Sequence, residues 1–222
     1  MSQAFQLTLI RHAQSANNAL PESRRIEDPP ITALGEQQVQ SLAERFRGEP
    51  VTHCLTSGFR RAVQTMAPVA EVVGCRPAIW TDLHEVGGCF AGFEYGQLEG
   101  RPGMNREDLQ SEFPEFDIPD DIDELGWWKS RPYEQYDQAR SRAEAQAKRL
   151  EAEFKDSSAN VVCVIHADFK ALMLEQLGVG TSVVLAQDLY NTGVTKFGYT
   201  DGKFELLQIN DVSHLSEPLV SS

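Results

Sequence analysis

Two histidines in this sequence follow short apolar segments that are typical of buried strands. Residues 6–10 run directly into Arg11 and His12, and residues 161–165 run directly into His166. Open α/β sheets bind ligands beyond the carboxyl ends of their strands, so we expect both imidazoles at one edge of the sheet. An imidazole in that place can act as a nucleophile or donate a hydrogen bond.

Arginines accompany the histidines at the same predicted edge. Arg11 precedes the first histidine, and Arg60 and Arg61 follow a third apolar segment at residues 53–56. Guanidinium groups bind the equatorial oxygens of a phosphoryl group, while imidazole supplies the nucleophile or a further donor. Together these residue types predict phosphoryl transfer.

The spacing of apolar residues predicts strands that alternate with helices. Leu42 and Phe46 recur at helical spacing after Thr32, a suitable N-cap, and Gly48 is a suitable stop. Strands are predicted at 6–10, 53–56, 78–81, 161–165, 194–199 and 204–209, and helices at 32–47, 60–73, 106–112, 133–154 and 168–177. This order predicts a three-layer α/β/α fold with a mostly parallel central sheet and an antiparallel edge strand.

The length of 222 residues and the 41% of apolar side chains fit a single domain over residues 1–222. Within it, residues at about 86–132 are rich in Gly, Pro, Asp and Glu without a sustained period, which predicts an inserted lid. The Trp127-Trp128 pair is expected mainly to pack this insertion against the core. In the helix that follows, Arg140 and Glu144 are spaced to form an ion pair on one face.

Charge and cysteine content exclude several classes of function. A net charge of −13 without a basic patch argues against a nucleic-acid or anionic-membrane partner. No apolar segment reaches the roughly 20 residues of a membrane span and no signal peptide is recognised, so we expect a cytoplasmic protein. The four cysteines lack metal-site spacing, which indicates reduced thiols. We expect neither a metal nor a cofactor, and a homodimer is left open.

Several segments carry a resemblance to a known family. Residues 11–18 resemble the signature Arg-His-Gly-x-Ser/Thr-x-x-Asn of the histidine phosphatase (phosphoglycerate mutase-like) superfamily, with Ala13 in place of the glycine. Further similar segments, in the family's order, lie at 32–38, 56–65, 83–85, 164–168, 191–195 and 210–215. The resemblance spans nearly the whole chain and favours the phosphatase branch.

The resemblance also implies a role for each residue that matches a motif. His12 would attack phosphorus to form a phosphohistidine, and Glu85 would protonate the leaving oxygen through a carboxyl group of raised pKa. Asp82, His84 and Glu94 remain alternative proton donors because the register there is open. The phosphoryl group would be held by Arg11, Arg61 and His166, and the pocket would be supported by Ser15 and Asn18. Arg60, by contrast, is expected to pair with a surface carboxylate.

Three activities are compatible with this resemblance: hydrolysis of a small phosphorylated metabolite, a mutase reaction, and phosphate binding without catalysis. A mutase needs extra cations in the lid, and Lys129 and Arg131 keep that alternative open. The intact histidines and arginines disfavour the inactive alternative. Ala13 and Asp168 depart from the family pattern, and whether they narrow or weaken activity stays open, as does the natural substrate.

Overall fold

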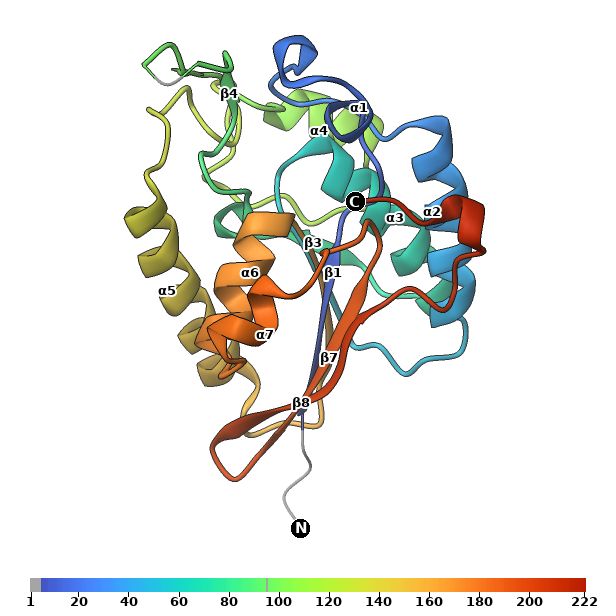
Figure 1. The fold of residues 1–222 in the computed structure, drawn as a ribbon. Coiled ribbons are helices and arrows are strands. Elements are labelled where there is room, and N and C mark those ends of the chain that lie inside the picture. The colour runs from blue at the N-terminus through green and yellow to red at the C-terminus, as the bar shows by residue number, and fades with distance from the viewer. Residues whose placement is uncertain (1–4, 95) are drawn as a thin grey trace.

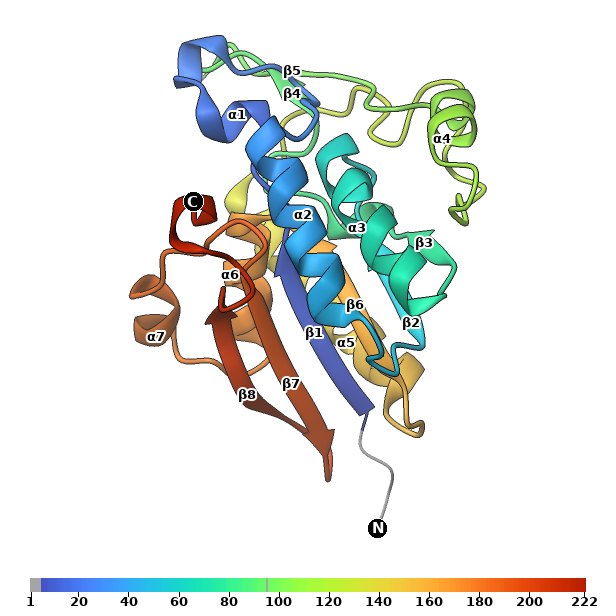
Figure 2. The same cartoon turned by 90° about the vertical axis from the view of Figure 1, so that its right-hand side faces the viewer.

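The computed structural model describes residues 5–94 and 96–222. In this described part of the chain, a six-stranded sheet, which Figure 1 shows nearly edge-on, has the order β3-β2-β6-β1-β7-β8 (Figure 2). The β1, β6, β2 and β3 strands are paired in parallel, and β7 runs antiparallel to both β1 and β8. The strands are β1 (Phe5–Arg11), β2 (His53–Thr56), β3 (Pro77–Ile79), β6 (Asn160–Ile165), β7 (Val194–Thr200) and β8 (Lys203–Asp211).

Both faces of the sheet are buried at its centre, because the side chains of the central strands alternate between two apolar clusters, whereas the edge strand β8 is largely exposed. In β6, Val161, Cys163 and Ile165 join one cluster, whereas Val162 and Val164 join the other. Each cluster is completed by helices, so the predicted three-layer α/β/α architecture is confirmed.

The two helical layers contain segments from different parts of the chain. The helices α2 and α3 pack on one face, while α5 and α6 pack on the other (Figure 2). The helices are α1 (Ala16–Ala19), α2 (Ala33–Phe46), α3 (Arg60–Val73), α4 (Arg106–Glu112), α5 (Tyr136–Phe154), α6 (Ala167–Gln176) and α7 (Thr181–Leu185), with 3-10 turns at Glu22–Arg24, Thr81–Leu83 and Glu217–Leu219. Among the described residues, no helix combines the length and the apolar character needed to cross a membrane.

The helix ends follow the predicted chemistry. The Thr32 side chain accepts a hydrogen bond of 3.1 Å from the backbone N–H of Gly35 at the start of α2. The α3 helix ends at Gly74, whose φ of 67° places it in the left-handed region that glycine tolerates. These signals are local, and they set both boundaries correctly.

Three local predictions need correction. The strand predicted at 78–81 is Pro77–Ile79, because Thr81–Leu83 turns into a 3-10 helix. The helix predicted from 133 begins at Tyr136, and the short α7 helix was not predicted.

The ion pair predicted between Arg140 and Glu144 is also wrong. Arg140 pairs instead with Glu175 of α6 at 2.7 Å, and Glu144 pairs with Lys148 at 2.5 Å. Because α5 packs against α6, the carboxylate of Glu175 lies within reach of Arg140 and takes the place predicted for Glu144.

The insertion lies above the carboxyl ends of the parallel strands and contains the short strands β4 (Phe90–Ala91) and β5 (Glu99–Gly100) together with α4 (Figure 2). Trp127 and Trp128 are 2% and 4% exposed and belong to the α3-side cluster, as expected for residues that fix the insertion. Gly58 and Gly103 both lie against the Trp127 ring, and an added Cβ would come within 2.6 Å and 2.2 Å of it.

The cysteines agree with the prediction of reduced thiols. Cys54, Cys89 and Cys163 are buried, Cys75 is partly buried, and all four are free in the described part of the chain.

Candidate active site

The predicted site residues come from three separate elements that meet beneath the insertion. Arg11 ends β1 and is followed by His12, His166 follows β6, and Arg61 lies in the first turn of α3. The two imidazole centroids are 5.0 Å apart. The two rings lie close together because β6 is the parallel neighbour of β1 in the sheet. The backbone N–H of His12 donates to the carbonyl oxygen of Ile165 over 2.9 Å, which continues this pairing.

His12 is buried with a fixed tautomer. Its Nδ1 lies 2.7 Å from the carbonyl oxygen of Ala13, which can only accept, so Nδ1 carries the proton. Its Nε2 accepts a hydrogen bond of 3.1 Å from Nε of Arg61 and therefore carries the lone pair. Burial, followed by the charges of Arg61 and Arg11, holds the pKa of His12 well below the usual 6.5. The ring is neutral near pH 7, as a nucleophile must be.

Three buried donors at this point have no hydrogen-bond partner within the described protein. They are Nε of Arg11, Nη1 of Arg61 and Nδ1 of His166. Buried polar atoms are normally paired, and leaving them unpaired costs about 1–3 kcal/mol each. Arg11 and Arg61 line the cavity together with His12, where the oxygens of an anion could accept hydrogen bonds from their unpaired nitrogens.

His166 is held from behind by a residue that we did not single out from the sequence. Its Nε2 shares a hydrogen bond of 2.7 Å with Oγ of Ser57, at the loop between β2 and α3. The Phe59 ring packs edge-on against it at 4.9 Å between centroids. Burial lowers the pKa of His166 well below 6.5. Ser57 lies inside the matched segment 56–65, so a signal existed, but no spacing rule linked it to His166.

Of the four proton-donor candidates, Glu85 lines the cavity beside His12. Its carboxylate accepts hydrogen bonds from the backbone N–H groups of Val86 at 2.8 Å and Phe169 at 3.0 Å. Burial, followed by the nearby carboxylate of Asp168, raises the pKa of Glu85 from 4.5. A carboxyl group with these properties can hold a proton closer to neutral pH.

The other three candidates lie elsewhere. His84 is buried against Trp128, and its Nδ1 donates to the carbonyl oxygen of Glu85 over 2.8 Å. The carboxylate of Asp82 faces Gln146, and Glu94 accepts from Gln97 on the surface.

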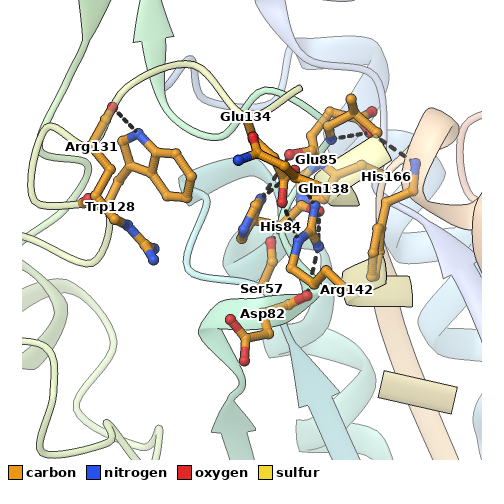
Figure 3. A network of polar contacts seen from close by, with 12 residues as sticks. Ser57, Asp82, His84, Glu85, Trp128, Arg131, Glu134, Gln138, Arg142 and His166 are labelled. Carbon is orange, nitrogen blue, oxygen red and sulfur yellow. Dashed lines mark hydrogen bonds and ion pairs between the residues drawn. The ribbon is translucent and has the colours of Figure 1, made fainter. Parts of the chain in front are cut away.

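Arg142 from α5 fixes the segment that carries Glu85 (Figure 3). Its Nη1 donates to the carbonyl oxygens of Asp82 at 2.7 Å and His84 at 3.0 Å, and its other nitrogens form a two-point ion pair with Glu134. Sequence reasoning did not assign Arg142 to the site, because its contacts depend on how α5 packs.

Ser15 and Asn18 support the loop after His12. The Asn18 Oδ1 accepts hydrogen bonds of 3.0 Å from both the backbone N–H and the hydroxyl of Ser15. Both residues line the cavity. Their bonds to each other stabilise the entry of α1.

The loop before β7 holds the end of β1. Asn191 donates from Nδ2 to the carbonyl oxygen of His12 over 3.0 Å, and Thr192 donates from its backbone N–H to the carbonyl oxygen of Arg11 over 3.0 Å. Lys170 is fully buried and donates to the carbonyl oxygen of Gly193 over 2.6 Å. This buried lysine was not predicted, since its sequence position is an ordinary one in a helix.

The cations of the insertion do not reach the cavity. Lys129 forms an ion pair of 2.6 Å with Asp123, and the Arg131 guanidinium lies 4.0 Å over the Trp128 ring. Arg60 also pairs outside the cavity, with Glu112, as predicted. Within residues 5–94 and 96–222 there is no group of three or more His, Cys, Asp or Glu side chains that could hold a metal ion.

Known proteins are similar to this chain in sequence and in fold. The sequence model of the histidine phosphatase superfamily (branch 1) matches residues 7–212. A probable phosphoglycerate mutase GpmB from Yersinia enterocolitica is 33% identical over 98 residues, which are 44% of this chain and 42% of that protein. The aligned stretch is therefore less than half of that relative.

Two solved structures share the fold across almost their entire length. YhfR from Bacillus stearothermophilus superposes with a TM-score of 0.68 at 20% identity and covers 95% of this chain and 99% of its own. Phosphoserine phosphatase from Entamoeba histolytica, solved in complex with 3-phosphoglyceric acid, superposes with a TM-score of 0.67 at 22% identity. The superposition covers 96% of this chain and 100% of that protein. At these identities the likeness establishes the fold.

Proposed function

The chain belongs to the histidine phosphatase superfamily (branch 1), and on this premise we propose that it hydrolyses a small phosphomonoester through a phosphohistidine on His12. The observation that carries the proposal is the buried His12 ring, whose Nε2 contacts Arg61 and whose centroid lies 5.0 Å from that of His166, at a cavity where Arg11 and Arg61 keep unpaired nitrogens. A phosphoryl group would satisfy these donors and place its phosphorus in front of the nucleophile.

The first chemical step transfers the phosphoryl group to the enzyme. The hydrogen bond from Nε of Arg61 to Nε2 of His12 breaks and frees the Nε2 lone pair. This lone pair attacks phosphorus, the bond to the ester oxygen breaks, and the leaving oxygen takes the proton of Glu85. The hydrogen bond from Nδ1 of His12 to Ala13 stabilises the positive charge that develops on the imidazole. Arg11 and Arg61 balance the charge of the phosphoryl oxygens.

The second step returns the enzyme to its initial state. The Glu85 carboxylate takes a proton from a water molecule as that water attacks phosphorus, and the bond between His12 and phosphorus breaks. Inorganic phosphate leaves with His12 neutral and Glu85 protonated. Arginine supplies all the positive charge that this scheme requires, so we propose that the reaction is metal-independent.

Trapping the intermediate tests the proposal. Rapid acid-free quenching after mixing with a 32P-labelled ester should give label on the wild-type protein that is stable to alkali and lost in acid, together with release of phosphate. The His12→Ala variant should show neither label nor turnover, and EDTA should leave both unchanged in the wild type. Label that persists on the His12→Ala protein would overturn the assignment of the nucleophile.

Mutase chemistry is the second candidate, and the name of the Yersinia relative supports it. Its requirement for additional cations is poorly met, because Lys129 and Arg131 are engaged away from the cavity. Positional isomers of a labelled phosphoglycerate, formed without release of phosphate, would favour the mutase.

A further inference from the structure

The cavity extends well beyond the space that a phosphoryl group fills. Its volume is about 440 Å³, within the range of pockets that enclose a whole small molecule. The loop that follows α1 and the β4–β5 hairpin lie on the same side of the molecule (Figure 2). Residues of both segments line the outer part of the cavity, which we call its outer wall. The alcohol part of the ester must therefore contact this wall.

The outer wall contains both charged and apolar side chains. The loop after α1 contributes Glu22, Arg25, Ile26 and Glu27, and the further apolar members are Val86, Phe90, Phe93 and Leu98. Ile26 is 52% exposed and Phe93 is 56% exposed, so both present apolar surface to a ligand in the cavity. A ligand that covers these two side chains would remove apolar surface from water, which is favourable.

The Phe90 ring is part of an aromatic pair at the cavity. It packs edge-on against Tyr133 at 4.9 Å between centroids, and both residues line the cavity. An aromatic ring can add to such an edge-to-face arrangement.

The charges of the outer cavity disfavour a second anionic group. Besides the phosphoryl-facing Arg11 and Arg61, the cation that lines it among the described residues is Arg25, and this side chain pairs with Glu22 at 3.3 Å. The carboxylates of Glu27 and Asp168 line the same space. A substrate carboxylate or second phosphate would meet these carboxylates, and it would have to compete with Glu22 for Arg25.

We propose that the substrates of this site are phosphomonoesters of uncharged, apolar or aromatic alcohols. This inference rests on the proposed function and adds the class of leaving group. The carboxylates could also attract an ammonium group, but a small aminoalcohol would leave Ile26 and Phe93 uncovered. Phosphocholine is therefore an outcome of the test rather than the expected substrate.

A matched pair of esters tests the charge argument. Phenyl phosphate and 3-carboxyphenyl phosphate release phenols of similar acidity and differ mainly in one carboxylate. We expect kcat/KM for phenyl phosphate to exceed that for 3-carboxyphenyl phosphate about tenfold or more. A tenfold ratio corresponds to about 1.4 kcal/mol. Equal values, or a preference for the carboxylated ester or phosphocholine, would overturn the inference.

Substitutions in the outer wall test the apolar contact. Phe93→Ser should lower kcat/KM for phenyl phosphate about tenfold, whereas Phe93→Leu should keep most of it, and inhibition by inorganic phosphate should stay unchanged in both. Leu185→Ser is the control, because Leu185 is 81% exposed outside the cavity. An unchanged kcat/KM in Phe93→Ser would contradict the apolar subsite.

Failure of the inference can be distinguished from failure of the proposed function. If the wild type forms the His12 phosphoenzyme and releases phosphate but shows no preference between the esters, only the substrate class falls. If no ester is turned over and no phosphoenzyme forms, both fall together.

Discussion

Arg61 donates a hydrogen bond from its Nε to Nε2 of His12 over 3.1 Å, so one guanidinium touches the nucleophile while its Nη1 is left for a ligand. The contact keeps the imidazole neutral, because a nearby positive charge disfavours its protonation. It also means that the incoming phosphoryl group must displace this hydrogen bond, because the same Nε2 lone pair has to attack phosphorus.

Substitution of Arg61 by lysine should therefore be costly. Lysine keeps the charge but loses the planar fork that can donate to two phosphoryl oxygens at once. We expect kcat/KM of Arg61→Lys to fall by about 10²–10³, as for removal of an oxyanion donor. Its neighbour provides the control: Arg60→Lys, whose side chain pairs with Glu112, should stay within about twofold of wild type. Similar losses in both variants would contradict the separation of roles.

The pH dependence of kcat/KM should be set by His12 and Glu85. His12 must be unprotonated, and its lowered pKa means that activity should persist as pH falls below 6.5. Glu85 must be protonated for the first step, and its raised pKa means that activity should decline on the alkaline side at a pH above 4.5. Glu85→Gln should be slower and should lack the alkaline decline. A variant profile that keeps this decline would assign it to another group.

Lys170 should make folding stability depend on pH. Burial lowers its pKa to about 7 from 10.5, so between these values the unfolded chain binds more protons than the folded chain. The stability contribution of this group therefore rises as pH increases from 7 toward 10.5. The difference in unfolding free energy between Lys170→Met and wild type should shift in favour of wild type by a few kcal/mol over this range. Urea unfolding of both proteins at pH 7 and pH 9.5 measures this difference in free energy. The same difference at both pH values would refute the lowered pKa of Lys170.

The contact between Gly58 and Trp127 should tie the insertion to the core. A Cβ at residue 58 would lie 2.6 Å from Cγ of Trp127, so Gly58→Ala must displace the ring. We expect a loss of about 1–3 kcal/mol in the free energy of unfolding, as for other overpacked sites. Gly180→Ala is the control, since nothing lies within 4 Å of the added Cβ. Equal stability of the two variants would show that the ring adapts freely.

The strands of the six-stranded sheet and most helices were predicted because their signals are local, whereas the short strands β4 and β5 were not predicted. Thr32 and Gly74 set helix ends by their own chemistry, and the apolar segments before His12 and His166 predicted that both rings lie at one sheet edge. These two positions follow from parallel pairing alone.

The remaining site contacts depend on packing between distant segments. Arg142 reaches the carbonyls around Glu85 from another helix, and Asn191 reaches the carbonyl of His12 from a loop. Neither contact leaves a periodicity or spacing that sequence reasoning could use. The same holds for Arg140, whose partner is Glu175 of α6 rather than a residue of its own helix.

The packing of Trp127 has an experimental use. Its indole touches Phe59 at 4.7 Å between centroids, and Phe59 touches the His166 ring at 4.9 Å. Indole emission responds to its immediate surroundings, so an anion that binds at His166 should change the intrinsic fluorescence. The protein thus carries a native optical reporter one side chain away from its proposed chemistry, and titration with vanadate or phosphate could be followed without any label.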